Sequence, residues 1–325
     1  MSEPLIVARG LEHTYMAGSP LAVRALNGAD LEVQRGEALG IIGPGGAGKS
    51  TLVQHLNGLL RPSRRGQLTI DGQDMADPRT DVQAIRRRIG LIFQRPEDQL
   101  FKPLVGDDIA FGPRQLGLPR PEVRARVQRA MALVGLDFEA FVDRPTLSLS
   151  GGERRRVAIA GVLALEPEVL ILDEATSGLD PQGRRELLDL LRRLHRQEGK
   201  TVILVASYME DLVDLAGRVA VLAGGRTVVQ GEIREVLAQG ELLQRHGLAA
   251  PEIAQIAEAL SARGCRLSRT PLSVQEAAAE IAPHLAQHPA MRERTVSGLS
   301  EVGDDRRLSN DGSPGCALGV ERGVL

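Results

Sequence analysis

Residues 43–51 read Gly43-Pro44-Gly45-Gly46-Ala47-Gly48-Lys49-Ser50-Thr51, which has the spacing G-x-x-x-x-G-K-[ST]. A short apolar run precedes this stretch, and a helical pattern follows it. Glycines let backbone N–H groups wrap a phosphate chain, and the N-terminus of the next helix adds partial positive charge. Lys49 is placed to neutralise the β- and γ-phosphates, and the Ser50 hydroxyl to bind Mg²⁺. The stretch therefore predicts a phosphate loop in a nucleotide-binding protein.

The composition narrows the class of protein. The 325 residues suit one large and one small domain, and 42% of them are hydrophobic. The net charge of -2 and the 2% of aromatic residues argue against a nucleic-acid partner. Apolar runs such as 157–165 are shorter than the roughly 18 residues of a membrane span. The two cysteines, Cys265 and Cys316, have no metal-binding spacing.

A second strand ends in two carboxylates. The run Val169-Leu170-Ile171-Leu172 is apolar throughout, which is typical of a strand buried on both faces of a parallel sheet, and Asp173 and Glu174 follow it. With a phosphate loop upstream, we interpret Asp173 as a Mg²⁺ ligand and Glu174 as the general base that polarises the attacking water. The alternative, two carboxylates that merely enter solvent, is less consistent with the phosphate loop.

Two further side chains are candidates because of their position. Gln94 follows the apolar strand 89–93, and ligands of open α/β sheets bind at such carboxyl ends. We interpret Gln94 as a catalytic and Mg²⁺-contacting residue. Tyr15 lies in the first hairpin, ahead of the phosphate loop. Its ring is either a stacking platform for the nucleotide base or an ordinary surface tyrosine, and the sequence favours neither.

A second helix N-terminus, at Ser150-Gly151-Gly152, is a candidate anion site. Ser150 also suits a plain helix cap, but a cap does not need two consecutive glycines, so we favour phosphate binding. The arginines that follow, 154–156, are interpreted as the solvated face of that helix.

Taken in order, these motifs resemble those of the ATP-binding cassette (ABC) ATPases over roughly residues 5–237. The resemblance implies an α/β P-loop NTPase fold with a parallel core sheet, an antiparallel β lobe and an inserted helical subdomain. It also implies that ATP and Mg²⁺ bind between two cassettes paired head to tail. Each ATP would contact the phosphate loop of one cassette and residues 150–152 of the other, with Asp180 close by. The loop at Gln94 would pass the motion to a membrane partner.

A narrower resemblance is to the energy-coupling factor (ECF) ATPases. It rests on Pro96-Glu97-Asp98-Gln99-Leu100-Phe101, on residues 108–113 and 155–164, and on the helical stretch 243–260. It implies a micronutrient importer for a vitamin or for cobalt or nickel, located at the cytoplasmic face of the membrane. The implied partners are a second ABC ATPase subunit, identical or different, a transmembrane coupling protein and a substrate-capturing membrane protein. We predict a nucleotide-binding domain over 1–240 with its helical subdomain at about 95–165, a helical segment over 241–289 and a disordered tail over 290–325.

The sequence departs from the family pattern after two strands. Ala175 replaces the usual proline after the catalytic glutamate, and Ser207 replaces the usual histidine that contacts the γ-phosphate. Serine is shorter and carries no positive charge. We therefore hypothesise an asymmetric dimer in which the site on this chain's own phosphate loop turns over slowly. The competing view is that Glu174 suffices and Ser207 costs little.

Three other functions remain as alternatives. The first is the ATPase of a conventional importer that uses a soluble binding protein. The second is a soluble ATP-driven switch on DNA or ribosomes, which the charge and the absence of a second cassette disfavour. The third is a regulator without catalysis, which the intact pair Asp173-Glu174 disfavours.

Overall fold

The computed structural model describes residues 3–249, 251–262, 267–268 and 271–287. The chain divides into two compact units, 1–277 and 278–325. In the second unit only the later part of α12 (Val274–Gln287) is described. The predicted tail, 290–325, and both cysteines lie outside the described residues, and the predicted domain boundary at residue 240 stays a prediction. Within the described residues, no helix is both long and apolar enough to span a membrane.

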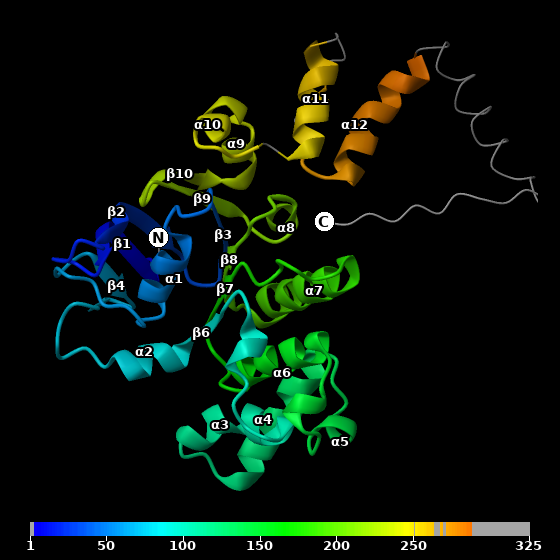
Figure 1. Ribbon diagram of the computed structural model, residues 1–325. Coiled ribbons are helices and arrows are strands. Elements are labelled where there is room, and N and C mark those ends of the chain that lie inside the picture. The colour runs from blue at the N-terminus through cyan, green and yellow to red at the C-terminus, as the bar shows by residue number, and fades with distance from the viewer. Residues whose placement is uncertain (1–2, 250, 263–266, 269–270, 288–325) are drawn as a thin grey trace, which may run out of the picture. The chain divides into compact units, whose positions relative to one another are not determined.

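A six-stranded sheet forms the centre of the first unit (Figure 1). Its strands lie in the order β10 (Arg226–Glu232), β9 (Arg218–Ala223), β3 (Ala38–Ile42), β8 (Thr201–Val205), β7 (Val169–Asp173) and β6 (Ile89–Ile92). Strands β9 to β6 are parallel, and β10 pairs antiparallel at one edge. Every residue of β3, β7 and β8 is buried, because both faces of the sheet are covered. The predicted parallel core sheet is confirmed.

A four-stranded antiparallel sheet forms the β lobe. Its order is β2 (Val23–Val33), β1 (Ile6–Tyr15), β4 (Leu68–Ile70) and β5 (Gln73–Asp74). The hairpin of β1 and β2 pairs Tyr15 with Val23 next to its connecting turn. The predicted antiparallel lobe is therefore confirmed.

Alternation along the central strands separates two hydrophobic cores. In β7, Val169 and Ile171 pack with α1 (Lys49–Leu56) and the antiparallel lobe. Leu170 and Leu172 point to the other face and pack with α6 (Gly151–Leu163) and α7 (Pro181–Glu198). Each buried aliphatic side chain of this kind contributes about 1.5–3 kcal/mol. The two hydrophobic cores thus pack against opposite faces of the central sheet.

Helices are inserted between β6 and β7, as predicted. After α2 (Val82–Arg88) and β6, the chain forms η1 (Pro96–Gln99), α3 (Val105–Gln115), α4 (Arg120–Leu133), α5 (Phe138–Phe141), η2 (Thr146–Ser148) and α6. Figure 1 shows α3 to α6 grouped at one end of the first unit. Past β8 come α8 (Glu210–Val213), α9 (Ile233–Leu237), α10 (Gly240–Arg245) and α11 (Glu252–Ala262).

The strand order brings the motifs to one edge of the sheet. Because β3, β6, β7 and β8 are parallel, their carboxyl ends lie side by side. The phosphate loop follows β3, Gln94 follows β6, Asp173 and Glu174 end β7, and Ser207 follows β8. Segments that are more than 150 residues apart in the chain therefore meet at this edge.

Candidate functional site

The phosphate loop needs glycine at two positions for reasons visible in this chain. A Cβ at Gly43 would lie 2.2 Å from the carbonyl oxygen of Leu222, and one at Gly48 would lie 2.4 Å from that of Ala25. Gly48 also has a φ of 97°. A Cβ at Gly45 would meet nothing within 4 Å, so the outer side of the loop is open. The loop is fixed to the sheet on one side and free to receive a ligand on the other.

Lys49 begins α1 and is buried, with 7% of its surface exposed. Its Nζ donates to the carbonyl oxygens of Gly43 at 2.9 Å and Pro44 at 3.2 Å, and it forms an ion pair with Oε1 of Glu174 at 3.2 Å. No side chain caps the N-terminus of α1. The cation and the free N–H groups of the helix therefore sit at the same place, as an anion site requires.

Asp173 and Ser50 form a small oxygen cluster beside the loop. Asp173 is 5% exposed, its Oδ1 has no hydrogen-bond partner, and the nearby Ser50 hydroxyl acts to lower the pKa of its carboxyl. Burial is the main cause that raises the pKa of Asp173, with a smaller contribution from the nearby Glu174. An unpartnered buried carboxylate oxygen next to a hydroxyl fits a Mg²⁺ ion that completes its shell with phosphate and water. Among the described residues no group of three or more His, Cys, Asp or Glu side chains could hold a metal without such help.

Glu174 lies between two of the predicted site residues. Its Oε1 pairs with Lys49, and its Oε2 accepts a hydrogen bond of 3.0 Å from the hydroxyl of Ser207. The backbone of Glu174 has a φ of 50°, in the left-handed region. It is held there because its N–H donates to the carbonyl of Val205 and its own carbonyl accepts from the N–H of Ser177. The turn thus fixes where the carboxylate points, at a cost of about 1–3 kcal/mol in backbone strain.

Gln94 is exposed and lies two residues after the end of β6. The contact found for it is through its backbone, whose carbonyl oxygen lies 3.5 Å from Nη2 of Arg155. The structure therefore brings Gln94 to the carboxyl edge of the sheet but joins its side chain to none of Lys49, Asp173 or Glu174 by a hydrogen bond.

The prediction that the arginines of α6 face solvent is wrong for Arg155. This side chain is 7% exposed and donates to backbone carbonyls on two other segments. Arg154 and Arg156 are partly exposed. A signal was available in the sequence, because Arg155 lies four residues before the apolar Ile159 and thus on the same face of the helix.

Ser150 caps α6, so the reading as a plain helix cap also describes this structure. The N–H of Glu153 donates to the Ser150 hydroxyl at 3.3 Å, and the N–H of Ser150 donates to the Glu153 carboxylate at 2.7 Å. Gly151 and Gly152 are exposed, and a Cβ on either would meet nothing within 4 Å. Neither packing nor a positive φ within this chain requires glycine at these two positions. Close approach by a group from outside the chain would account for them.

Ser150 and Asp180 cap α6 and α7, and the hydrogen bonds found for them do not reach the phosphate loop of the same chain. Figure 1 shows α6 and α7 on the other side of the sheet from α1. Asp180 is exposed and caps α7 by accepting from the N–H of Gly183 at 3.3 Å. The phosphate loop and the helix N-terminus that Ser150 caps therefore belong to helices on opposite sides of the sheet.

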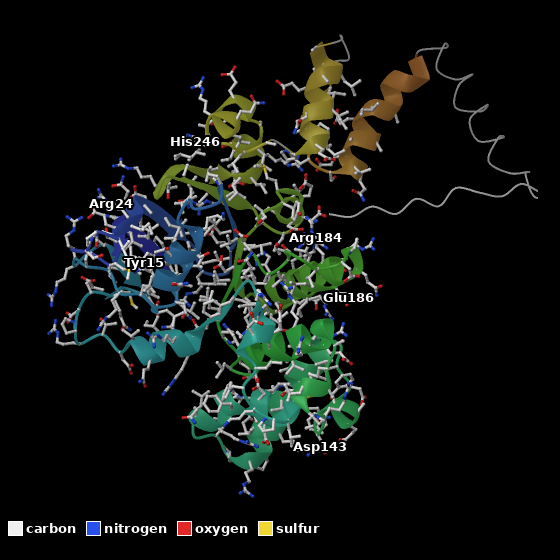
Figure 2. The ribbon with its side chains drawn as sticks, viewed as in Figure 1. Tyr15, Arg24, Asp143, Arg184, Glu186 and His246 are labelled. Carbon is white, nitrogen blue, oxygen red and sulfur yellow. The ribbon has the colours of Figure 1, made fainter. Side chains whose placement is uncertain are left out.

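Tyr15 contacts the phosphate-loop helix directly. Its hydroxyl shares a hydrogen bond of 3.2 Å with that of Thr51, and its ring packs edge-on against His13 at 4.4 Å. His13 in turn bonds to the fully buried His55 through their ring nitrogens at 3.1 Å. Tyr15 (Figure 2) keeps 38% of its surface exposed, so part of the residue is accessible to a ligand. The sequence reading missed this histidine support, since His13 and His55 are 42 residues apart.

Comparisons with known proteins agree with this geometry. The family model described as "ABC transporter" matches residues 26–177. The energy-coupling factor transporter ATP-binding protein EcfA2 of Symbiobacterium thermophilum is 47% identical over 281 residues, which cover 86% of this chain and 96% of the relative. EcfA2 of Clostridium perfringens is 44% identical over 272 residues, covering 84% and 95%. This chain belongs to the ABC transporter family. Within it, the chain is an ECF-type ATP-binding subunit.

Solved structures support the same assignment. The structure of cbiO1 from Clostridium perfringens, described as part of the ABC transporter complex cbiONQ, has 36% identity and a TM-score of 0.65. The match covers 80% of this chain and all of that one. A dimeric cassette, MJ0796, in a post-hydrolysis state bound to ADP and phosphate has 28% identity and a TM-score of 0.62, over 70% of this chain and 99% of that one. The chain is therefore an ATP-binding ABC ATPase.

Proposed function

We propose that this chain hydrolyses Mg²⁺-ATP with Glu174 as the general base. Lys49 would exchange its carbonyl and carboxylate partners for the β- and γ-phosphate oxygens when ATP enters the loop. Glu174, released from Lys49, would then accept the proton of the attacking water. Ser50, Asp173 and Gln94 would hold Mg²⁺, which supplies positive charge to the phosphate oxygens. The remaining loop residues would donate backbone N–H groups to the phosphates.

One observation carries this proposal: the carboxylate of Glu174 lies between the phosphate-loop lysine and Ser207, at 3.2 Å and 3.0 Å. A general base must be within hydrogen-bond reach of the reacting groups, and Lys49 marks the place of the γ-phosphate. The strained backbone of Glu174 supports the same role, because strain of this kind is typical of active sites.

The test is ATP turnover by the assembled complex with Glu174→Gln and with Glu186→Gln as control. Glu186 (Figure 2) is an exposed carboxylate on α7. We expect Glu174→Gln to lower turnover by about 10²–10⁴-fold with ATP still bound, and Glu186→Gln to match the parent. Parent-level turnover in Glu174→Gln would show that the base lies elsewhere.

We propose further that two cassettes complete each other's sites. Ser150, Gly151, Gly152 and Asp180 would contact the ATP held on the phosphate loop of the second cassette. The position of α6 and α7 on the opposite side of the sheet from α1 and the open space beside Gly151 and Gly152 support this arrangement. Symbiobacterium thermophilum has both an EcfA2 and an EcfA1 relative, 47% and 45% identical to this chain, which favours a pair of different cassettes.

The proposed complex is an ECF importer for a micronutrient, a vitamin or cobalt or nickel. This chain would bind a transmembrane coupling protein at the cytoplasmic face of the membrane, and a separate membrane protein would capture the substrate. The similarity to energy-coupling factor transporter ATP-binding proteins and to a subunit of the cbiONQ complex supports this proposal.

The partners can be identified by purifying the detergent-solubilised complex from its native membrane. Recovery of a coupling protein, a small substrate-capturing protein and a second, different cassette is the expected result. Recovery of only this cassette and a coupling protein would remove the asymmetric dimer. A soluble substrate-binding protein in the complex would instead indicate a conventional importer, and the absence of any membrane protein would overturn the transport function.

A further inference from the structure

Arg155 is a buried cation that the catalytic proposal above does not use. It projects from the second turn of α6 and has 7% of its surface exposed. Nη2 donates a short hydrogen bond to the carbonyl of Ala175 and lies 3.5 Å from the carbonyl of Gln94. Nη1 lies 3.4 Å from the carbonyl of Ser177. One guanidinium therefore joins the start of α6 to two loops that leave neighbouring strands.

Both loops carry proposed catalytic residues. Gln94 follows β6, and the turn 175–177 follows Glu174 at the end of β7. The same turn carries the N–H of Ser177 that fixes the carbonyl of Glu174 in its left-handed conformation. Arg155 itself lies three residues after Gly152 in the same helix. It thus touches the backbone of the Gln94 loop and of the Glu174 turn from the helix that begins at Ser150.

Packing alone does not explain an arginine at this position. Its neighbours on the buried face of α6, such as Ile159, are apolar, and burial lowers the pKa of Arg155, with Glu97 acting in the opposite direction. Burying a guanidinium costs free energy that an apolar side chain of equal volume would avoid. Its planar fork, by contrast, presents donors on separate nitrogens in a fixed arrangement that can bind carbonyl oxygens on two loops at once. Methionine has no donor, and lysine carries its donors on a single, freely rotating ammonium group.

We propose that Arg155 is a positioning residue that fixes the Gln94 loop and the 175–177 turn relative to the start of α6. Its guanidinium makes these three segments move together, so that Gln94 and Glu174 reach the ATP in their productive arrangement. The inference rests on the roles given to Gln94 and Glu174 above. Arg155 links the backbone of the Gln94 loop to that of the Glu174 turn and does not itself contact the substrate.

The first experiment compares Arg155→Met, Arg155→Lys and Arg156→Met in the assembled complex. Arg156 is the matched control, since it lies on the same helix turn but is partly exposed and pairs loosely with Glu186 at 3.7 Å. We expect Arg155→Met to lower kcat by about 10- to 100-fold with KM for ATP within about twofold of the parent. Arg155→Lys should recover part of kcat, and Arg156→Met should match the parent. Equal kcat in Arg155→Met and Arg156→Met would overturn the proposal, as would a loss confined to KM.

A double-mutant cycle separates positioning from a general loss of stability. If Arg155 acts through the Gln94 loop, the kcat losses of Arg155→Met and Gln94→Ala are less than multiplicative when combined. Multiplicative losses would mean that Arg155 acts independently of that loop and would overturn the proposal. Thermal melting of each variant checks that the losses in kcat are not caused by a smaller fraction of folded protein. Glu174→Gln in the same assay tests the catalytic proposal separately, so failure of one inference is distinguishable from failure of the other.

Discussion

The hydroxyl of Ser207 donates a hydrogen bond of 3.0 Å to Oε2 of Glu174, while Lys49 pairs with Oε1 of the same carboxylate. Ser207 stands where the family usually has a histidine, and it still contacts the proposed general base. The structure thus retains the link between the ends of β7 and β8. What the serine does not supply is a longer reach or a positive charge towards the γ-phosphate.

The first prediction concerns this substitution. In the assembled complex, Ser207→His should raise ATP turnover at this chain's own site, because a regained contact to the transition state contributes up to about 3 kcal/mol, or a hundredfold. Single-turnover measurement of the ATP on this chain's phosphate loop reports the gain. Ser207→Ala is the companion variant, and we expect it to turn over no faster than the parent. Unchanged turnover in Ser207→His would contradict the weakened-site hypothesis and favour the view that Glu174 suffices.

The second prediction concerns Tyr15 and nucleotide affinity. If its exposed ring stacks on the base, Tyr15→Ala should weaken ATP binding by about 1–3 kcal/mol, as measured by titration of the nucleotide. Tyr15→Phe keeps the ring and loses only the hydrogen bond to Thr51, so most of the affinity should remain. An ordinary surface tyrosine would give parent affinity in both variants.

The third prediction concerns Asp173 and pH. Burial raises the pKa of Asp173 in the folded chain above the ordinary value of 3.8, which applies to the unfolded chain. At a pH between the unfolded and the folded pKa of Asp173, the folded chain therefore binds more protons than the unfolded chain. Stability without nucleotide therefore falls as pH rises through that window, and the loss is complete above it. Asp173→Asn should raise the melting temperature at pH 8, with a gain that shrinks towards pH 3.8. The same variant should turn over ATP more slowly and require a higher Mg²⁺ concentration, because a Mg²⁺ ligand is lost. An equal or lower melting temperature at pH 8 would contradict the assigned charge.

The fourth prediction concerns acid stability. Burial and the neighbouring His13 lower the pKa of His55 from 6.5 to about 4. In the unfolded chain His55 binds a proton below about pH 6.5, whereas in the folded chain it binds one only below about pH 4. The free energy of unfolding therefore falls as pH drops through this range. The slope attributable to one proton is about 1.4 kcal/mol per pH unit. His55→Leu should flatten this slope in denaturant titrations between pH 6.5 and 4, whereas His246→Leu (Figure 2) serves as a control outside the pair. An unchanged slope in His55→Leu would show that other groups control acid unfolding.

Sequence reasoning succeeded where a local pattern is tied to local chemistry. The phosphate loop, the buried strand ending in Asp173 and Glu174, and the order of the motifs predicted the parallel core sheet and the ABC family. It was wrong for Arg155, because a run of three arginines resembles a solvated face unless each position is assigned to a side of the helix. It did not predict the contact between His13 and His55, since no local pattern connects residues 42 positions apart.

The sequence by itself determined the candidate groups for ATP binding and hydrolysis, because glycine spacing, a lysine and two carboxylates are properties of residue type and local order. Tertiary structure alone decided how they are arranged. Parallel pairing of β3, β8, β7 and β6 brings the ends of distant strands to one edge, so that Lys49, Glu174 and Ser207 meet there. It also places α6 on the other side of the sheet from α1 and turns Arg155 inward, where a charge is stable only with carbonyl partners from other segments.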